Sequence, residues 1–579
     1  MTRWFTDKKL RRVAASTLMV AGLGGGMLAG IFASATTSGA TGSVLVMESS
    51  PESALTANFN PYISSSETQV GATSLIYESV LQFDIAQPTV PPYGFIASTY
   101  KWGSGGTSIM FAIRPGIKYS DGSTLTAADV AKCYSEVGAN AAINGGGVAI
   151  TSATSAGNVV TVNFSSAQYT NLQNIGTVPI VGPAFWTAAG SSPATYADAG
   201  AIAGTGPYKL QAGYSSGTIT LVQNPNYWGG PQWTTKAPWV TPATAAAPDP
   251  VGTFTSGPTE VQFPQIGSNT SVLSLLDNNT LDWAGNFITG LSSTFLKGTG
   301  HAVWFAPVNT VTMWPNLTVF PTNMLAVREA ISLAVNRNTL SFVGESGFEP
   351  PATSMSGLTE PGFSSLVSSK IGNFNDNASI KAAKAVLVKA GWKMGQNGYF
   401  NLKGKELSLN LGDPSAYTDY ASDCALAADE LRAAGFNATF IGQTPQAWGQ
   451  AMQVGHFQLD IHWGASSISA YQVYNNWLNS KLIGTGGGDF ERSRNAAMQT
   501  DLTTLAGATT VKAQKADLLP IEQYVAANLP VIPILYGASF DEYNTGAFSG
   551  WPTSTNAYES GSPNTPTNEV IVLHLTAAS

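Results

Sequence analysis

The chain has 579 residues, more than a single hydrophobic core organises, so two or three domains are expected. Only 11% of the residues are charged while 44% are hydrophobic and 10% are aromatic, which excludes an intrinsically disordered chain. The net charge is −8, and it is −12 without the first twelve residues, so the body has no electrostatic reason to bind nucleic acid or anionic lipid.

Uncharged small and polar residues replace the missing charges along most of the chain. One hypothesis is that the protein works in an acidic external medium. Carboxylates are protonated in such a medium, and lysines and arginines left without partners would repel one another.

The N-terminus has the pattern of an export signal. Basic residues end at Arg12, an uncharged apolar stretch covers 13–35, and Ala33-Ser-Ala35 is a small-x-small cleavage site, with 38–40 as a second candidate. We therefore predict a signal peptide at 1–35. An uncleaved membrane anchor is the alternative, because the apolar stretch is long enough to span a bilayer.

The first half of the chain predicts strands and helices in mixed order. Thr126 is a helix N-cap, and Gly157-Asn158 is a hairpin turn. The expected elements are a strand at 43–47, a loop at 58–62, a helix leading into a strand at 71–83, a strand at 108–114, a helix at 127–137, a hairpin at 148–164, a strand pair at 204–210 and 217–224, and a Pro/Thr/Ala-rich loop at 229–257.

The second half continues in the same rhythm, which predicts an α/β or α+β fold. The expected helices are 272–278, 325–335, 380–389, 421–434, 448–454 and 513–527, the last with a break or a new start at Pro520. The expected strands are 303–305, 311–314, 407–412, one that ends at Phe440, 459–463, 531–536 and 570–575.

The sequence offers little for catalysis. It has no Walker A or HExxH motif, and its acidic residues are too scattered to nominate a glycosidase pair. GYSSG at 213–217 matches the nucleophile elbow of serine hydrolases, which requires a helix directly after it. Strand-like residues 218–222 follow instead, so a hairpin turn explains the motif better. We therefore expect no enzyme and no cofactor.

The cysteines and histidines do not predict a metal site. Cys133 and Cys424 lie in separate predicted helices, where a disulfide or two buried free thiols are both possible. The histidines share no ligand spacing and are expected to be structural. They are His301, His456, His462 and His574.

Five motifs in order carry a resemblance to a known family. They are FAIRPGIKYSDGSTLTAADV at 111–130, GTGPY at 204–208 with NPNYW at 224–228, VREAI at 327–331 with AVNR at 334–337, LVKAG at 387–391, and LPVIPI at 529–534. Together they resemble the signature of the extracellular solute-binding proteins of family 5, the oligopeptide- and dipeptide-binding group. The charged motif residues Arg114, Asp121, Asp129 and Arg328 are expected to be scaffold ion pairs or caps.

The resemblance implies a two-lobe α/β flytrap of the periplasmic-binding-protein type (type II, cluster C) with an inserted subdomain. The first lobe is then expected to combine 44–87 and 201–305 with a C-terminal return at 531–579. The inserted subdomain is expected at 88–200, and the second lobe at 306–530.

The resemblance also places the ligand near residue 463. Peptide binders of the family carry W-x-x-D after a strand of the second lobe, where the Asp pairs with the α-amino group of the peptide. The matching stretch here is Trp463-Gly464-Ala465-Ser466, so the carboxylate is replaced by a hydroxyl. A buried α-ammonium would lack its partner, and a neutral ligand fits better.

Further candidates for ligand contact lie elsewhere in the chain. Tyr471, Tyr474 and Trp477 offer aromatic faces for a sugar, or form one apolar face of a helix at spacing i, i+3, i+6. The remaining candidates are Asn60 in an early loop, Trp314 and Asn316 near the entry to the second lobe, and Trp448 in a helix where core packing is the alternative.

These features predict an exported, monomeric solute-binding protein of the cell envelope or extracellular space. It would capture an oligopeptide or an oligosaccharide and deliver it to an ABC permease–ATPase complex, with no nucleic-acid partner. An exported hydrolase is one alternative. A transporter-independent surface sensor or adhesin with the same fold is another.

Overall fold

The computed structural model describes residues 43–48, 55–63, 71, 73–200, 202–211, 217–229, 257–374, 378–485, 487–563 and 565–578. The predicted signal peptide, residues 213–216 of the GYSSG turn and most of the predicted loop 229–257 lie outside these residues. Residues 42–579 form one compact unit. Within the described part, no helix is long and apolar enough to cross a membrane.

Residues 43–305 and 540–578, which we call the flanking region, contain two four-stranded sheets. One sheet has the order β1(Val44–Val46), β10(Glu260–Pro264), β9(Thr218–Gln223), β8(Tyr208–Leu210). The other has the order β4(Ala97–Trp102), β5(Ser108–Ile113), β7(Val159–Phe164), β6(Ile150–Ala156). Smaller sheets join β11(Trp283–Ala284), β21(Glu542–Asn544) and β12(His301–Val303), β2(Leu81–Gln82) with β3(Tyr93–Gly94), and β22(Phe548–Ser549) with β23(Thr576–Ala577).

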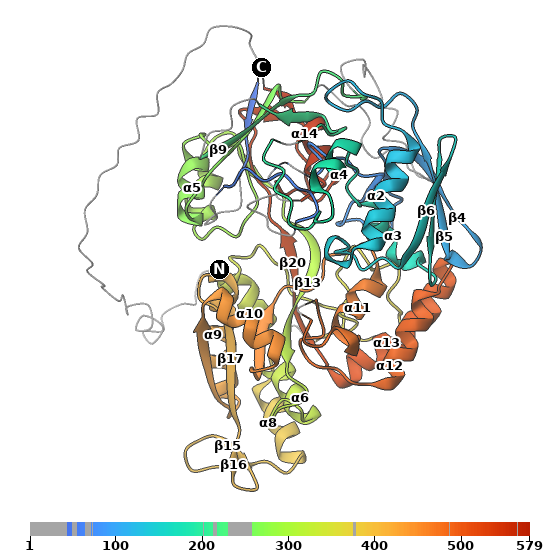
Figure 1. Cartoon of the computed structure of the whole chain (residues 1–579). Coiled ribbons are helices and arrows are strands. Elements are labelled where there is room, and N and C mark those ends of the chain that lie inside the picture. The colour runs from blue at the N-terminus through green and yellow to red at the C-terminus, as the bar shows by residue number, and fades with distance from the viewer. Residues whose placement is uncertain are drawn as a thin grey trace. The chain divides into compact units, whose positions relative to one another are not determined.

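Residues 306–539, which we call the central region, are built around a five-stranded sheet. Its order is β18(Asn437–Gln443), β17(Ser408–Pro414), β19(Leu459–His462), β13(Ala306–Pro315), β20(Ile532–Ser539). A small sheet of β14(Lys393–Met394), β15(Phe400–Leu402) and β16(Lys405–Glu406) lies at one end of this region (Figure 1).

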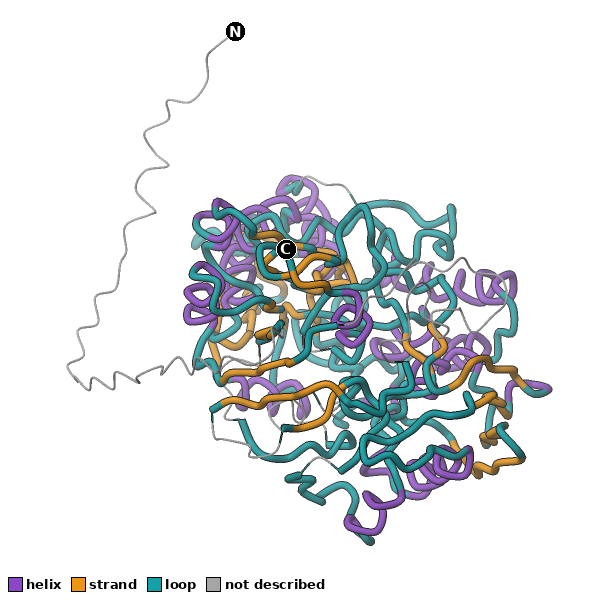
Figure 2. The backbone as a smooth tube through the Cα atoms, turned by 90° about the horizontal axis from the view of Figure 1, so that it is seen from above, coloured by secondary structure: helices purple, strands orange, loops and turns teal. Residues whose placement is uncertain are grey.

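Helices cover the sheets of both regions, and long loops separate many of the elements (Figure 2). Those of the flanking region are α2(Ala127–Ala139), α3(Leu172–Gly176), α4(Pro183–Ala189), α5(Asn269–Asp277) and α14(Asn568–His574). Those of the central region are α6(Leu325–Ala334), α7(Arg337–Thr339), α8(Ile380–Lys389), α9(Thr418–Ala433), α10(Pro445–Val454), α11(Ala470–Leu478), α12(Ala496–Ala506) and α13(Val511–Asn528).

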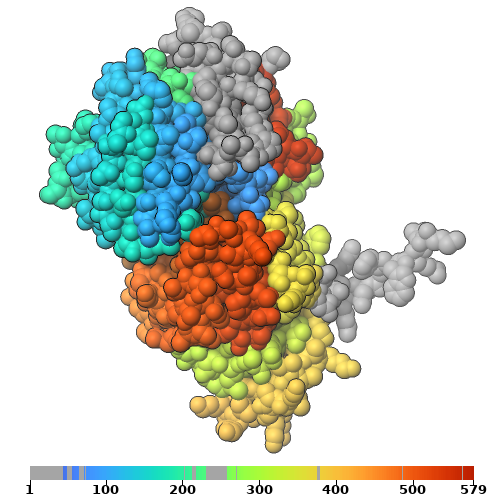
Figure 3. All heavy atoms as spheres, turned by 90° about the vertical axis from the view of Figure 1, so that its right-hand side faces the viewer, coloured from blue at the N-terminus to red at the C-terminus, as the bar shows by residue number. Residues whose placement is uncertain are grey.

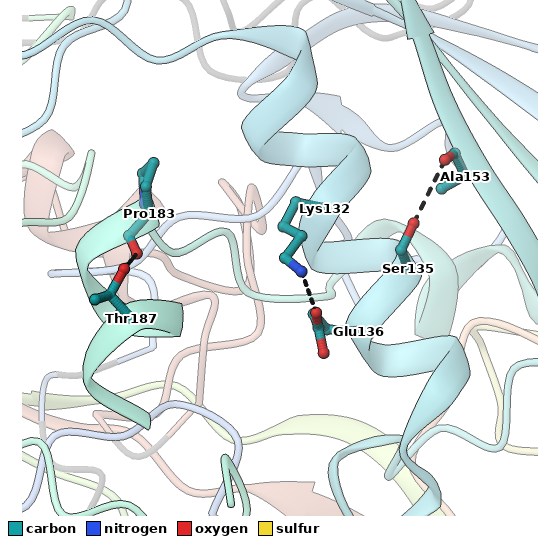
Figure 4. Close-up of polar contacts among 6 residues, drawn as sticks. All are labelled: Lys132, Ser135, Glu136, Ala153, Pro183 and Thr187. Atoms are coloured by element: carbon teal, nitrogen blue, oxygen red, sulfur yellow. Dashed lines mark hydrogen bonds and ion pairs between the residues drawn. The ribbon is translucent and has the colours of Figure 1, made fainter. Parts of the chain in front are cut away.

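Helix α2 shows how local sequence sets an element. Thr126 and Asp129 form the predicted N-terminal cap as a reciprocal capping box. On one side the Ser135 hydroxyl donates to the carbonyl oxygen of Ala153 in β6 at 3.4 Å, and on the outer side Lys132 pairs with Glu136 one turn later (Figure 4). The buried face, which includes Val130 and Tyr134, packs into the largest hydrophobic cluster.

The motif arginines are scaffold residues, as predicted, but they bind carbonyl groups rather than carboxylates. Arg114 donates to the backbone oxygens of Phe95 and Gly94, and its guanidinium lies 5.5 Å from the Trp228 ring. Arg328 donates to the backbone oxygens of residues 322, 528 and 529. The two arginines therefore hold neighbouring loops together through backbone hydrogen bonds instead of forming ion pairs.

Two predicted elements and one predicted helix break are wrong. The predicted strand 570–575 is helix α14, whose residues are all buried, and an apolar run without periodicity does not distinguish a buried helix from a buried strand. The predicted helix in 71–83 is absent from the described residues there, because Gly206 and Tyr208 donate their backbone N–H groups to the carbonyls of Ile76 and Leu75.

The predicted break at Pro520 is also wrong, since α13 runs through it. A proline removes one helical hydrogen bond, and the burial of Leu518, Ile521 and Val525 against their neighbours offsets that loss. Cys133 and Cys424 are buried free thiols rather than a disulfide.

The interior holds many carboxyl groups but few basic partners. Seventeen acidic residues are buried, and among the described residues none of them forms an ion pair with a lysine or arginine. They are Glu48, Glu78, Asp84, Asp198, Asp282, Glu345, Glu349, Asp413, Asp423, Asp460, Asp489, Glu491, Glu522, Asp541, Glu542, Glu559 and Glu569. An unpaired buried carboxylate is costly, so burial favours the neutral acid.

We predict that the protein is more stable at pH 4 than at pH 8. Burial raises the pKa of Glu48 to about 8 and that of Asp84 to about 6. An acid whose folded-state pKa exceeds its unfolded value stabilises the fold fully below the unfolded pKa, and this contribution is lost as the pH rises through the folded-state pKa. Thermal unfolding at pH 4, 6 and 8 should show a melting temperature that falls by at least about 5 °C.

Replacing one buried acid should reduce the fall of the melting temperature between pH 4 and pH 8. Glu48→Gln keeps an acceptor for the backbone N–H of Gly285 and removes the proton that Glu48 must hold. Asp277→Asn, at an exposed position, is the control and should leave that fall unchanged. A melting temperature that rises from pH 4 to pH 8 in the parent protein would contradict the inference.

Candidate functional site

The loop after β19, residues 463–469, presents an aromatic ring beside the central sheet. Trp463 is 45% exposed, and its inner face packs on His462 with ring centroids 3.5 Å apart. The next residue, Gly464, is buried, and a Cβ there would lie 2.6 Å from the Thr310 carbonyl oxygen. Glycine thus lets the loop lie directly on β13 while the tryptophan faces outward.

The layer beneath Trp463 is aromatic and uncharged. Burial lowers the pKa of His462 to about 3, so its imidazole is neutral. Trp448 packs edge-on against His462 and donates its indole N–H to Asp460 at 2.9 Å. Burial also raises the pKa of Asp460 and Asp413 well above their usual range. Trp448 therefore acts here as a support for the loop.

A cavity of about 550 Å³ lies beside this loop, between the two regions. The flanking region contributes Gly145–Gly147 and residues of the 167–174 segment, and the central region contributes Ala465–Ser467 and residues of α11. Ser466 and Tyr471 line it. None of the lining residues that the structure describes is charged. In Figure 3 the orange spheres of the central region meet the blue and teal spheres of the flanking region on this side of the molecule.

Side-chain amides join the two regions at the cavity. The Gln173 carbonyl oxygen accepts hydrogen bonds from the Ser467 hydroxyl at 3.0 Å and from the backbone N–H of Ile468 at 3.1 Å. The Gln472 amide donates to the Asn171 oxygen at 2.8 Å. These bonds tether α3 and the residue before it to α11 and to the loop that precedes α11.

Further carboxamides line both walls. Asn174 donates to Asn171 at 2.8 Å, and Asn171 donates to Gln168 at 3.0 Å. On α11's side Asn479 donates to Asn475 at 2.9 Å. Each carboxamide both donates and accepts hydrogen bonds, so these walls suit a ligand that is rich in hydroxyl groups.

Of the predicted site residues other than Ser466 and Tyr471, Trp463, Gly464 and Trp448 do not line this cavity, and the remaining ones lie away from it. Asn60 and Asn316 are fully buried, and their amides donate to backbone carbonyls of neighbouring loops. Trp314 is 3% exposed and stacks on Phe490. On α11, Tyr474 and Trp477 belong to the core, as the helix-face interpretation expects, while Tyr471 faces the cavity.

Sequence reasoning missed the amides of the flanking region. Gln168, Asn171, Gln173 and Asn174 fall within seven residues, and this density was a usable signal. Nothing in the local pattern, however, places that segment opposite residues 466–479, which lie about three hundred positions later. Among the described residues, no group of three or more histidine, cysteine or acidic side chains is arranged to hold a metal ion.

Comparison with known proteins identifies the family. The model for the middle part of the bacterial extracellular solute-binding proteins, family 5, matches residues 92–484. The chain belongs to this family. It is therefore a solute-binding protein rather than an enzyme, and the hydrolase alternative is set aside.

The chain is also similar to individual solute-binding proteins. The chain is 23% identical to the nickel-binding periplasmic protein of Escherichia coli over 70% of this chain and 73% of that protein. The periplasmic oligopeptide-binding protein of an oligopeptide ABC transporter from Thermotoga maritima has a TM-score of 0.81 at 18% identity, covering 93% of this chain and 99% of that one. The same protein with bound mannohexaose has a TM-score of 0.75 at 18% identity and equal coverage. The chain has the predicted two-lobe fold.

We predict that Gln173→Ala loosens the contact between the flanking region and the central region. The variant removes two hydrogen bonds, each worth about 1 kcal/mol net, so the equilibrium should shift toward open forms by roughly ten-fold or more. Small-angle X-ray scattering of the ligand-free protein should show a larger radius of gyration. The exposed Gln211→Ala is the matched control, and equal scattering by both variants would contradict the tether.

Proposed function

We propose that this protein captures a neutral oligosaccharide in the cavity between its lobes and delivers it to an ABC permease. The observation that carries the proposal is that no described residue in the lining of the 550 Å³ cavity is charged. A volume of this size is typical of a small-molecule site.

A peptide would bring charged termini into this cavity. An α-ammonium and an α-carboxylate lose their hydration on burial and require partners of opposite charge. Ser466 stands where the resemblance to peptide binders implies an Asp, and it is exposed to the cavity. Its hydroxyl offers a hydrogen bond but does not compensate a full charge.

A sugar fits the groups that are present. Amides of Asn171, Gln472 and Asn475 supply donors and acceptors for hydroxyl groups, and the ring of Tyr471 in the lining offers an apolar face. Trp463 is 45% exposed and lies two residues before the lining residue Ala465, but it does not itself line the cavity. The mannohexaose complex of the Thermotoga maritima protein supports this choice, although that protein is named for oligopeptides.

We define the two lobes by the hydrophobic clusters at their centres. We assign lobe I to the flanking region, with 88–200 as its inserted subdomain, and lobe II to the central region. Because β20 pairs with β13 in the central sheet, the return to lobe I is proposed to begin after Ser539 rather than at 531. Residues 1–35 are proposed to direct export, so that the body acts as a monomer outside the cytoplasmic membrane beside the permease–ATPase complex.

Titration calorimetry of the mature chain is the direct test. Neutral oligosaccharides of two to six units should release heat, and peptides of two to six residues should not. Tyr471→Ala should weaken sugar binding by about ten-fold, because it removes the aromatic face of the cavity lining. Binding of peptides alone, with no response to any sugar, would sink the proposal.

Restoring the carboxylate should change the specificity. Ser466→Asp should weaken neutral sugar binding and create measurable affinity for short peptides, because it supplies a partner for the α-ammonium. Ser466→Asn adds similar bulk without charge and should gain no peptide affinity. Calorimetry on both variants separates charge from volume, and equal behaviour of the two would show that charge at this position does not select the ligand.

A further inference from the structure

A second cavity of about 300 Å³ opens beside the first, again with walls from both regions. Thr170 lines both cavities, which makes them neighbours. The flanking region contributes Trp102 and Tyr169 to the second cavity, and the central region contributes Ser469 and the turn before α13. As in the first cavity, the lining residues within the described part of the chain carry no charge.

Two aromatic rings form one wall. The rings of Trp102 and Tyr169 lie 4.9 Å apart at an angle of 52°, and Phe164 packs behind Trp102 at 6.3 Å. Gly106 makes the close approach of Tyr169 possible, because a Cβ there would lie 2.3 Å from the Tyr169 ring. Its φ of 67° is one that glycine adopts readily. Both aromatic side chains keep part of their surface exposed.

The facing wall offers polar groups without charge. Ser469 is only 7% exposed, yet its hydroxyl has no hydrogen-bond partner among the described residues. A buried hydroxyl without a partner costs free energy, which a ligand group at hydrogen-bond distance would recover. Thr509, Thr510 and Gln514 extend this polar wall.

We propose that the second cavity is a further sugar subsite, which binds additional units of the same oligosaccharide that occupies the first. This assignment rests on the proposed function. An aromatic platform opposite uncharged donors and acceptors matches a pyranose ring, which presents an apolar face and a rim of hydroxyl groups. One wall comes from each lobe, so the subsite is complete only when the two lobes are in contact. A longer ligand that fills both cavities would therefore favour the closed arrangement of the lobes.

The test is the dependence of affinity on ligand length. Mannobiose and mannohexaose, titrated into the full mature chain, should differ in affinity by at least about ten-fold in the parent protein. Trp102→Ala should remove most of that gain and leave the affinity for mannobiose within about two-fold. Ser469→Ala, a minimal change that should not disturb folding, should reduce the gain by roughly three-fold or more.

Ser493→Ala is the matched control. Ser493 is also buried with a hydroxyl that lacks a partner in the described part of the chain, but it lines neither cavity. It should leave both affinities unchanged. A loss of affinity that is equal for both sugars, or no loss in either subsite variant, overturns the second subsite while the proposed function stands. If the parent protein binds neither these sugars nor other neutral oligosaccharides, the proposed function fails and the subsite falls with it.

Discussion

The antiparallel pairing of β13 with β20 is the contact on which the arrangement of the binding cleft depends. β13 brings the chain into the central region at Ala306, and β20 returns it after Ser539. Because these crossing strands bond to each other and to the rest of the five-stranded sheet, the two lobes share a paired connection rather than independent linkers. Register shifts in this pair add local twist, and the loop of Gly464 lies on Thr310 of the same strand. The loop that carries Trp463 therefore rests on the same strand that leads the chain into the central region.

The protein interior and the described walls of the cavity have in common that they carry few or no ionised side chains. Buried acids such as Glu48 and Asp541 have no basic partners among the described residues, and burial raises their pKa, so the fold is built around neutral carboxyl groups. The low content of charged residues in the sequence and the uncharged cavity walls follow the same rule. All three fit the hypothesis of an acidic medium, in which a charged cleft would bind protons and ions in competition with its ligand.

Predictions that rest on contacts within a few residues agree with the structure more closely than those that depend on distant contacts. Capping and hairpin chemistry act within a few residues, and they predicted α2 and the β6–β7 pair closely. The strand predicted at 570–575 failed because an apolar run that is buried on every side has no period to read. The resemblance to a family motif pointed to the segment 463–466, of which Ala465 and Ser466 line the cavity and Trp463 and Gly464 do not. Asn60 and Asn316 were predicted to contact the ligand, but both are buried, because sequence does not reveal which amides are already bonded to nearby backbone.

The sequence by itself determined the family, the mixed α/β character, the scarcity of charge and the uncharged side chain at Ser466. These properties are written in residue identities and in short-range order, where hydrogen-bond geometry and side-chain chemistry act locally. Only the tertiary structure decided that Gln173 and Asn171 meet Ser467 and Gln472, and that Trp102 faces Ser469 across a second cavity. These contacts join positions some three hundred residues apart, and their formation depends on how the sheets and helices of both lobes pack, which no local pattern specifies.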